Sequence, residues 1–317
     1  MAGPVIERFA ALDSAYREHT GRGERLYARF SALAGLSCDA APDALASHAL
    51  AIRDALNDGL GMWRAPARSM RLVFGAALAA ADRTAAHFFE AREALARQRK
   101  ARGGRRLTHG GACAALGLVA GGGQAHHADT FYDILETIAA PWWRRDAARE
   151  EVVAAIFAAM GETPEDALTH LEKARTALLT AGVPRADAEA AACEIAFYDY
   201  DATAIAPAWT TLNTALRNHN KLRHGVGKTG LAVLAAQGNN PSTAKALIGN
   251  FDAVRSLEPR PPANVAAKLA LRLTQAQIGD TAPIAAARDL AAILAAQAAM
   301  IAAVTAASSA AAVAATS

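Results

Sequence analysis

The stretch HGVGKTG, residues 224–230, resembles the loop with which many enzymes hold the phosphates of ATP or GTP. That loop needs the pattern G-x-x-x-x-G-K-[ST], because its first glycine makes the turn that aims successive amides at the phosphates. The first glycine is replaced by Leu222, and no strand-like apolar run precedes the stretch. The sequence favours a helix that ends at a glycine, followed by a helix with Lys228 and Thr229 in its first turn. We predict no nucleotide binding, and no other cofactor motif is present.

Histidines and an aspartate gather after a glycine run at 121–123, where His126, His127 and Asp129 follow His109. Successive residues of a helix point about 100° apart, so His126 and His127 do not easily share one metal ion. Asp129 precedes TFYDIL and is predicted to cap the amino end of that helix. The spacing therefore argues against a metal site.

Two other pairs could do chemistry. His219 and His224 are five residues apart and miss the i, i+4 spacing of a helical metal pair. Asp199 and Asp201, in FYDYDATAIAPAW, would face one cleft if the chain were extended. We favour a loop pinned by its aromatic residues, with the two acids acting as caps or turn formers.

The segment PWWRRD, residues 141–146, is the best candidate for an interaction site. Trp142, Trp143, Arg144 and Arg145 combine large apolar area with bidentate donors, a combination typical of protein interfaces. The alternative, which we prefer because tryptophan is mostly buried, is a joint between repeats. A protein or peptide partner stays open.

Charge gives little support for other partners. The chain has 33 basic and 30 acidic residues, a net charge of +3, which gives no general argument for nucleic acid. The basic run from Arg97 to Arg106 is interpreted as a solvated helix end and loop. Cys38, Cys113 and Cys193 are too widely spaced for a disulfide framework or zinc cluster, and Cys113 and Cys193 are predicted to be small buried residues. The amino terminus shows no export signal, so we expect a cytoplasmic protein.

The elements that must position these residues are helical. Alanine dominates the 53% hydrophobic content, and aromatic residues make up 6%. Alanine has the highest helix propensity, and the alternation typical of strands is nearly absent. The sequence therefore predicts an all-α protein.

One pattern occurs three times: a short apolar helix, a polar turn and an amphipathic helix. Aligning Leu78, Phe157 and Leu234 gives spacings of 79 and 77 residues, and an alanine-rich segment follows each copy. The repeat predicts an α-solenoid-like stack of about three units with roughly four helices each. We assign residues 1–70 to an amino-terminal segment or cap, 71–305 to repeats with a capping helix, and 306–317 to a flexible alanine and serine tail.

The carboxy-terminal segment from Leu290 to Ser317 has no charge and is long enough to span a bilayer. Most of its residues are alanine or serine, which contribute little transfer energy. Its larger residues, Leu290, Ile293, Leu294, Met300, Ile301 and Val304, form one helical stripe. We predict that this stripe docks on the last repeat as a cap, and we expect no membrane contact.

The layout of the chain has three characteristic features. They are a W-R-x-x-x-R-x-x-x-R-like entry (Trp63, Arg64, Arg68 and Arg71), repeated apolar helices that end in x-x-L-A-A, and a helix LAAILAAQAAM before an uncharged tail. In these features the chain resembles a bacterial family of uncharacterised helical proteins, domain of unknown function number four thousand and three. The resemblance implies an all-helical fold and brings no activity or site residue.

Two functions stay open. The sequence favours a non-catalytic helical binding or scaffold protein that presents a groove between repeats. The alternative is an enzyme or a small-ligand-binding protein with a site in the helical core, near His126, His127 and Asp129 or near Asp199 and Asp201. A closed apolar pocket with converging polar groups would favour the second function.

Overall fold

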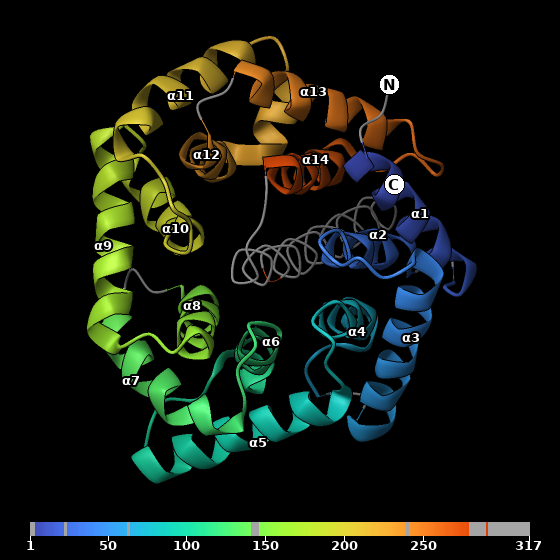
Figure 1. Cartoon of the computed structure of the whole chain (residues 1–317), viewed down its shortest axis with the longest axis vertical. Helices are drawn as coiled ribbons and strands as arrows, with labels where there is room; N and C mark the ends of the chain where they lie inside the picture. The colour runs from blue at the N-terminus through green and yellow to red at the C-terminus, as the bar shows by residue number, and fades with distance from the viewer. Residues whose placement is uncertain are drawn as a thin grey trace, which may run out of the picture.

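The computed structural model describes residues 4–21, 24–61, 64–140, 146–238, 241–278 and 290. Within these residues the chain forms fourteen α-helices and no strand, which confirms the all-α prediction. The helices alternate between an outer and an inner layer of one closed ring (Figure 1), and the segment 1–70 supplies α1 to α3. The outer layer contains α1 (Pro4–Glu18), α3 (Pro42–Gly59), α5 (Ala85–Arg102), α7 (Ala128–Ile138), α9 (Pro164–Thr180), α11 (Ala202–Ala215) and α13 (Pro241–Arg255). The inner layer contains α2 (Arg25–Ala34), α4 (Arg71–Ala80), α6 (Ala112–Ala120), α8 (Ala147–Met160), α10 (Arg185–Ile195), α12 (Asn220–Gln237) and α14 (Ala263–Ile278).

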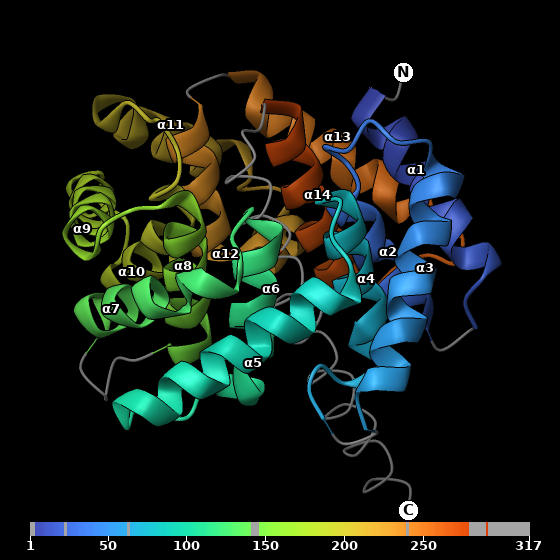
Figure 2. The same cartoon turned by 60° about the horizontal axis from the view of Figure 1, so that its bottom comes forward.

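Helix composition explains which layer each helix joins. The inner helix α6 is buried at every residue from Ala112 to Val119, and α8 is buried from Glu150 to Ala158. The outer helix α9 buries four of its 17 residues. Turned by 60°, the ring has α3 and α5 outside α4 and α6 (Figure 2). A helix that is apolar all round needs neighbours on every side, whereas an amphipathic helix needs them on one. The apolar and amphipathic helices of the sequence pattern are therefore the inner and outer layers.

The repeating unit is a pair of helices, half the length that the sequence indicated. The carbonyls of Leu78, Leu118 and Phe157, on α4, α6 and α8, each accept a hydrogen bond from the amide five residues ahead, at 2.8, 2.8 and 3.1 Å. The residue four ahead has a positive φ each time, 53°, 92° and 77°. This helix end recurs after 40 and then 39 residues, so the spacings of 79 and 77 span two hairpins each. The alanine-rich segment that followed each copy is the next inner helix.

The hairpins close into a ring, whereas the sequence predicted a stack of repeats whose last unit is capped by the tail. Helix α14 contacts both α1 and α2. Arg17 Nη1 donates to the Glu258 carbonyl at 2.6 Å, and Arg29 Nη2 donates to the Pro259 carbonyl at 2.6 Å. The buried Asp13 carboxylate lies between the two arginines, with Oδ2 at 3.1 Å from Arg17 Nε and 3.8 Å from Arg29 Nε. The first hairpin thus holds the connection between α13 and α14.

Leu290 is the one residue of the uncharged tail that the structure describes, and it is 1% exposed. A Cβ added to Gly117 of α6 would lie 3.1 Å from Leu290 Cδ1, so this leucine packs against α6. The absence of a side chain at Gly117 leaves the space that Leu290 needs. The other members of the predicted stripe lie outside the described residues. None of the described helices is long and apolar enough to cross a bilayer.

We expect Arg29→Met to lower the free energy of unfolding by about 3 kcal/mol, because it removes one of the two cations that face the buried Asp13. Urea denaturation measures the change. Arg25→Met, which alters an exposed arginine on the same helix, should change stability by less than about 0.5 kcal/mol. Equal effects of the two substitutions would contradict a role for Arg29 in closing the ring.

Leu290→Ala should destabilise the protein by about 2 kcal/mol, since it removes buried methyl groups and leaves a cavity beside Gly117. Deletion of residues 290–317 should lower the melting temperature further and expose apolar surface. Thermal denaturation with an apolar-surface dye measures both. Leu179→Ala is the control, because Leu179 is 39% exposed. A truncated protein as stable as the full chain would refute the docking of the tail.

Candidate functional site

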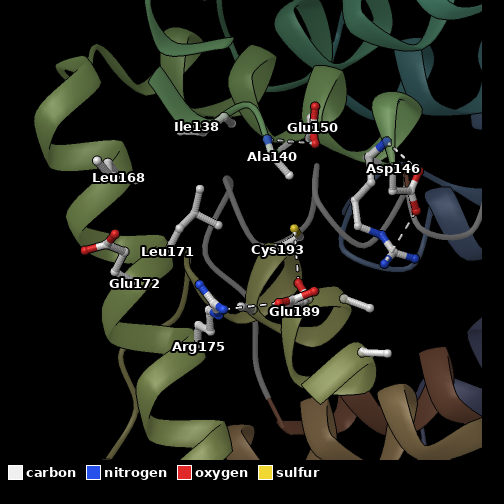
Figure 3. Close-up of a pocket in the computed structure, with 14 residues that line it drawn as sticks. Ile138, Ala140, Asp146, Glu150, Leu168, Leu171, Glu172, Arg175, Glu189 and Cys193 are labelled. Atoms are coloured by element: carbon white, nitrogen blue, oxygen red, sulfur yellow. Dashed lines mark hydrogen bonds and ion pairs between the residues drawn. The ribbon is translucent and has the colours of Figure 1, made fainter. Parts of the chain in front are cut away.

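A cavity of about 540 Å³ lies between the outer helices α7 and α9 and the inner helices α8 and α10 (Figure 3). Its apolar wall is formed by Ile138, Leu168, Leu171 and alanines of α10, including Ala190. Helix α8 packs far more extensively on α6 than on α10, so the inner layer is loosely packed at this seam. The volume lies within the range of roughly 300–1,000 Å³ that is typical of small-molecule sites.

One polar edge of the cavity joins α9 to α10. Arg175 Nη2 lies 3.2 Å from Glu189 Oε1 (Figure 3), and Arg185 Nε lies 3.2 Å from the same oxygen. Because the Glu189 carboxylate faces two guanidinium groups, it is held in one orientation at the cavity wall. The Arg175 side chain is 38% exposed, so this pair is at the cavity mouth.

The amino end of α8 forms the other polar edge. Asp146 Oδ1 accepts a hydrogen bond from the Arg149 amide at 3.3 Å and so caps the helix. Glu150 Oε1 accepts from the Ala140 amide at 3.2 Å, and its Oε2 lies 3.5 Å from Arg105 Nη2. The cavity thus combines an apolar wall with polar groups that already have partners.

Cys193 is the one candidate nucleophile among the described lining residues. Its Sγ donates to the Glu189 carbonyl at 3.5 Å, and burial raises the pKa of the thiol to about 12. The thiolate is the reactive form of cysteine, and a thiol with this pKa is protonated at neutral pH. No histidine is among the described lining residues to act as a base. The described lining therefore offers a protonated thiol without an imidazole beside it.

The next residue, Glu194, belongs to a separate interaction. Its two carboxylate oxygens lie 2.9 and 3.1 Å from the guanidinium of Arg272 on α14. The pair therefore joins α10 to α14, although α12 is the inner helix between them. Burial works to raise the pKa of Glu194, but attraction to Arg272 and Arg149 outweighs it and holds the pKa below its usual range. Arg272 also donates to Gln275 at 2.7 Å. This bidentate pair links two hairpins of the ring.

The HGVGKTG stretch is a packing motif inside α12. Gly227, with φ 72°, interrupts the helix, and a Cβ on Gly225 would meet the Ala267 Cβ of α14 at 2.4 Å. The Thr229 hydroxyl donates to Asp187 Oδ1 at 2.9 Å, and Lys228 is exposed. The interpretation as a helix end followed by a new helix is confirmed. The absence of nucleotide binding stays a prediction.

The His126 and His127 rings lie 4.0 Å apart between centroids, tilted by 32°, and His127 Nδ1 accepts from the Gln124 amide at 3.0 Å. Asp129 was predicted to cap α7, and this is wrong. It is the second residue of α7, and its carboxylate is bound by Gln98 and Arg102. A 3₁₀ turn over residues 125–127 starts the helix earlier than its apolar pattern suggested. Among the described residues, no group of three or more His, Cys, Asp or Glu side chains is arranged to hold a metal ion.

Asp201 caps α11, as predicted: Oδ1 accepts from the Thr203 amide at 2.9 Å and the Thr203 hydroxyl at 2.7 Å. Asp199 is exposed. Phe197 is buried with its ring 4.6 Å from that of Phe157, which confirms that aromatic residues pin this loop. The exposed His219 and His224 lie on either side of the start of α12. Neither these histidines nor the two aspartates line the cavity.

The proposed partner-binding residues Trp142, Trp143, Arg144 and Arg145 lie outside the described residues. Their neighbours in the chain, Ala140 and Asp146, line the cavity.

The arginine-rich entry and the basic run have structural roles. Arg71 is buried and donates to the carbonyls of Gly61 at 2.8 Å and Pro66 at 3.2 Å, so it holds the connection before α4. Helix α5 ends at Arg102 within the basic run, which confirms the predicted helix end, but Arg102 and Arg105 form ion pairs and are not simply solvated.

Cys113 is buried, as predicted, whereas Cys193 is half-buried at the cavity. The sequence did not single out Arg175 and Glu189. The one sequence signal for this pair is the i, i+4 spacing of Arg185 and Glu189, which is common on solvated helices.

No protein-family model matches the chain, and neither a curated protein nor a solved structure is significantly similar to it. The link to the bacterial family of uncharacterised helical proteins therefore stays a prediction. Function has to be inferred from the site itself.

Glu194→Gln should lower the free energy of unfolding by about 3 kcal/mol at pH 7, because it leaves Arg272 without its carboxylate. The folded pKa of Glu194 is depressed from 4.5, so the pair stabilises the protein above that pH and loses its effect as the pH falls through the folded pKa. Urea denaturation from pH 7 to pH 3 should show the gap between wild type and variant closing. Glu172→Gln, at an exposed glutamate, should show no gap. A gap that does not change with pH would contradict the assignment.

Proposed function

We propose that this chain is a non-catalytic binding protein whose ligand is a small, mainly apolar organic molecule held in the cavity between α7, α8, α9 and α10. The observation that carries the proposal is the cavity of about 540 Å³, with leucine, isoleucine and alanine on its wall and oriented polar groups at its edges. Sites for small molecules generally combine these two kinds of lining.

The ligand's apolar part fits against Leu168, Leu171 and Ala190, where burial of apolar surface supplies the binding energy. Its polar part fits beside Glu189 and Arg175, which offer an acceptor and a donor at the mouth. The protonated thiol of Cys193 argues for reversible binding without a covalent intermediate.

A peptide-binding groove has less support. The scaffold interpretation relied on an open stack with a long concave face, and the hairpins instead close on themselves. The predicted partner site at Trp142 to Arg145 lies next to the cavity in the chain, and a protein or peptide partner there stays a prediction.

Nile red, a neutral apolar dye, tests the cavity directly. We expect the full chain to bind it with one-to-one stoichiometry and a rise in fluorescence. Ala190→Phe should weaken binding at least about tenfold, because the new ring fills the space beside Leu171. Fluorescence titration measures the affinity, and thermal denaturation checks that the variant is folded.

The matched control is Ala96→Phe, which adds the same ring at an exposed position of α5. It should bind the dye as the wild type does. Equal affinities for all three proteins would rule out the cavity as the dye site, and a loss of binding in both variants would point to nonspecific adsorption.

A further inference from the structure

The two ends of the ring carry opposite charge. Every inner helix follows an outer one along the chain, so all inner helices run in the same direction. The connections that lead into inner helices therefore meet at one end of the ring, and those that lead out of them meet at the other. We call the first the basic end and the second the acidic end.

Five exposed arginines lie in the described parts of the connections at the basic end. None has a hydrogen bond or ion pair from its side chain to a described residue: Arg64, Arg68, Arg106, Arg217 and Arg260. The acids in the described parts of these connections are Glu24, Asp146 and Glu258, and Asp146 is already paired with Arg149 at 3.7 Å. The basic end therefore has guanidinium groups in excess.

The acidic end has the opposite composition. Its connections contain Asp39, Asp82, Glu162, Asp199 and Asp201. Arg83 is the only lysine or arginine in the described parts of these connections. The balanced net charge of +3 thus conceals a separation of charge that appears only when the chain is folded into a ring.

The arginines at the basic end also lie close to other cations. Burial lowers the pKa of Arg92, and the exposed Arg64 lowers it further. Burial likewise lowers the pKa of Arg71, and the exposed Arg68 adds to this effect. Like charges this close together would be relieved by an anion bound at the surface.

We propose that the basic end binds the phosphate backbone of nucleic acid, without sequence preference. Arginine presents a planar fork of donors that matches two oxygens of a phosphate, and the five unpaired side chains belong to four connections around the ring. A polyanion that covers several of them releases counterions at each contact, which makes binding strong at low salt.

A second copy of the chain fits the basic end less well. Of the five carboxylates in the described connections of its acidic end, that of Asp201 already accepts two hydrogen bonds from Thr203. Exposed ion pairs contribute little each, and a handful do not offset the loss of translational and rotational freedom on association.

An anionic bilayer is also a poorer fit. Peripheral membrane binding usually adds apolar insertion to charge. Among the described residues, the large apolar side chains with the greatest exposure are Met160 and Ile278, at the acidic end, and Leu179, in the last turn of α9 at the basic end. The described residues of the basic end therefore offer charge and a single exposed leucine, without an apolar cluster.

Fluorescence anisotropy of the full chain with a labelled DNA duplex of about 20 base pairs tests the proposal. We expect binding that weakens steeply between about 50 and 200 mM salt. Arg64→Glu/Arg217→Glu should weaken binding at least about tenfold at the lower salt and reduce the slope of log affinity against log salt by about two. Lys173→Glu/Lys245→Glu is the control, because it makes the same change in net charge at exposed positions on α9 and α13.

The control variant should bind almost as the wild type does, and circular dichroism should show all three proteins equally helical. Equal weakening by both double variants would assign binding to net charge and overturn the proposal. Absence of binding at low salt would also overturn it. So would binding of vesicles containing phosphatidylserine without binding of DNA, or salt-sensitive self-association that Arg64→Glu/Arg217→Glu abolishes.

Discussion

The ring depends on the contact between its first and last hairpins. Asp13, Arg17 and Arg29 belong to α1 and α2, and they reach the carbonyls of Glu258 and Pro259 before α14. This contact gives every inner helix an inner neighbour on each side. Without it, α2 and α14 would each expose an apolar face to water. Burial of Asp13 raises the pKa of its carboxyl although both arginines lower it, so the charges are costly to bury and fix the geometry of closure.

Small side chains make the closed inner layer possible. Alanine and glycine let α12 and α14 approach until Gly225 has no room for a Cβ beside Ala267. Helices this close leave little space between them, and the inner layer is accordingly buried along most of its length. The seam between α8 and α10 is looser, and the candidate ligand cavity lies there. Because the inner helices pack tightly elsewhere, the candidate ligand cavity lies at this looser seam.

Local features of the fold could be predicted from the sequence, and long-range ones could not. Helix propensity and amphipathicity identified the helices and the difference between α4 and α5, and side-chain chemistry identified the Asp201 cap. The contact of Arg29 with Pro259 joins residues 230 positions apart, and no spacing rule predicts it. The cavity depends on how the four helices α7 to α10 pack around it, which also has no local sequence signal. The charge separation between the ends becomes visible only once each connection is assigned to one end of the ring.

The hairpins of the ring repeat one arrangement, an outer helix followed by an inner one. In an open solenoid, duplication can add one such unit at a time, because each unit contacts only its neighbours. A closed ring does not permit this kind of growth. An extra hairpin would separate Arg29 from Pro259 unless the angle between every pair of hairpins changed as well. The number of hairpins and the curvature of the ring are therefore inherited together, and insertions in this architecture are confined to its connections.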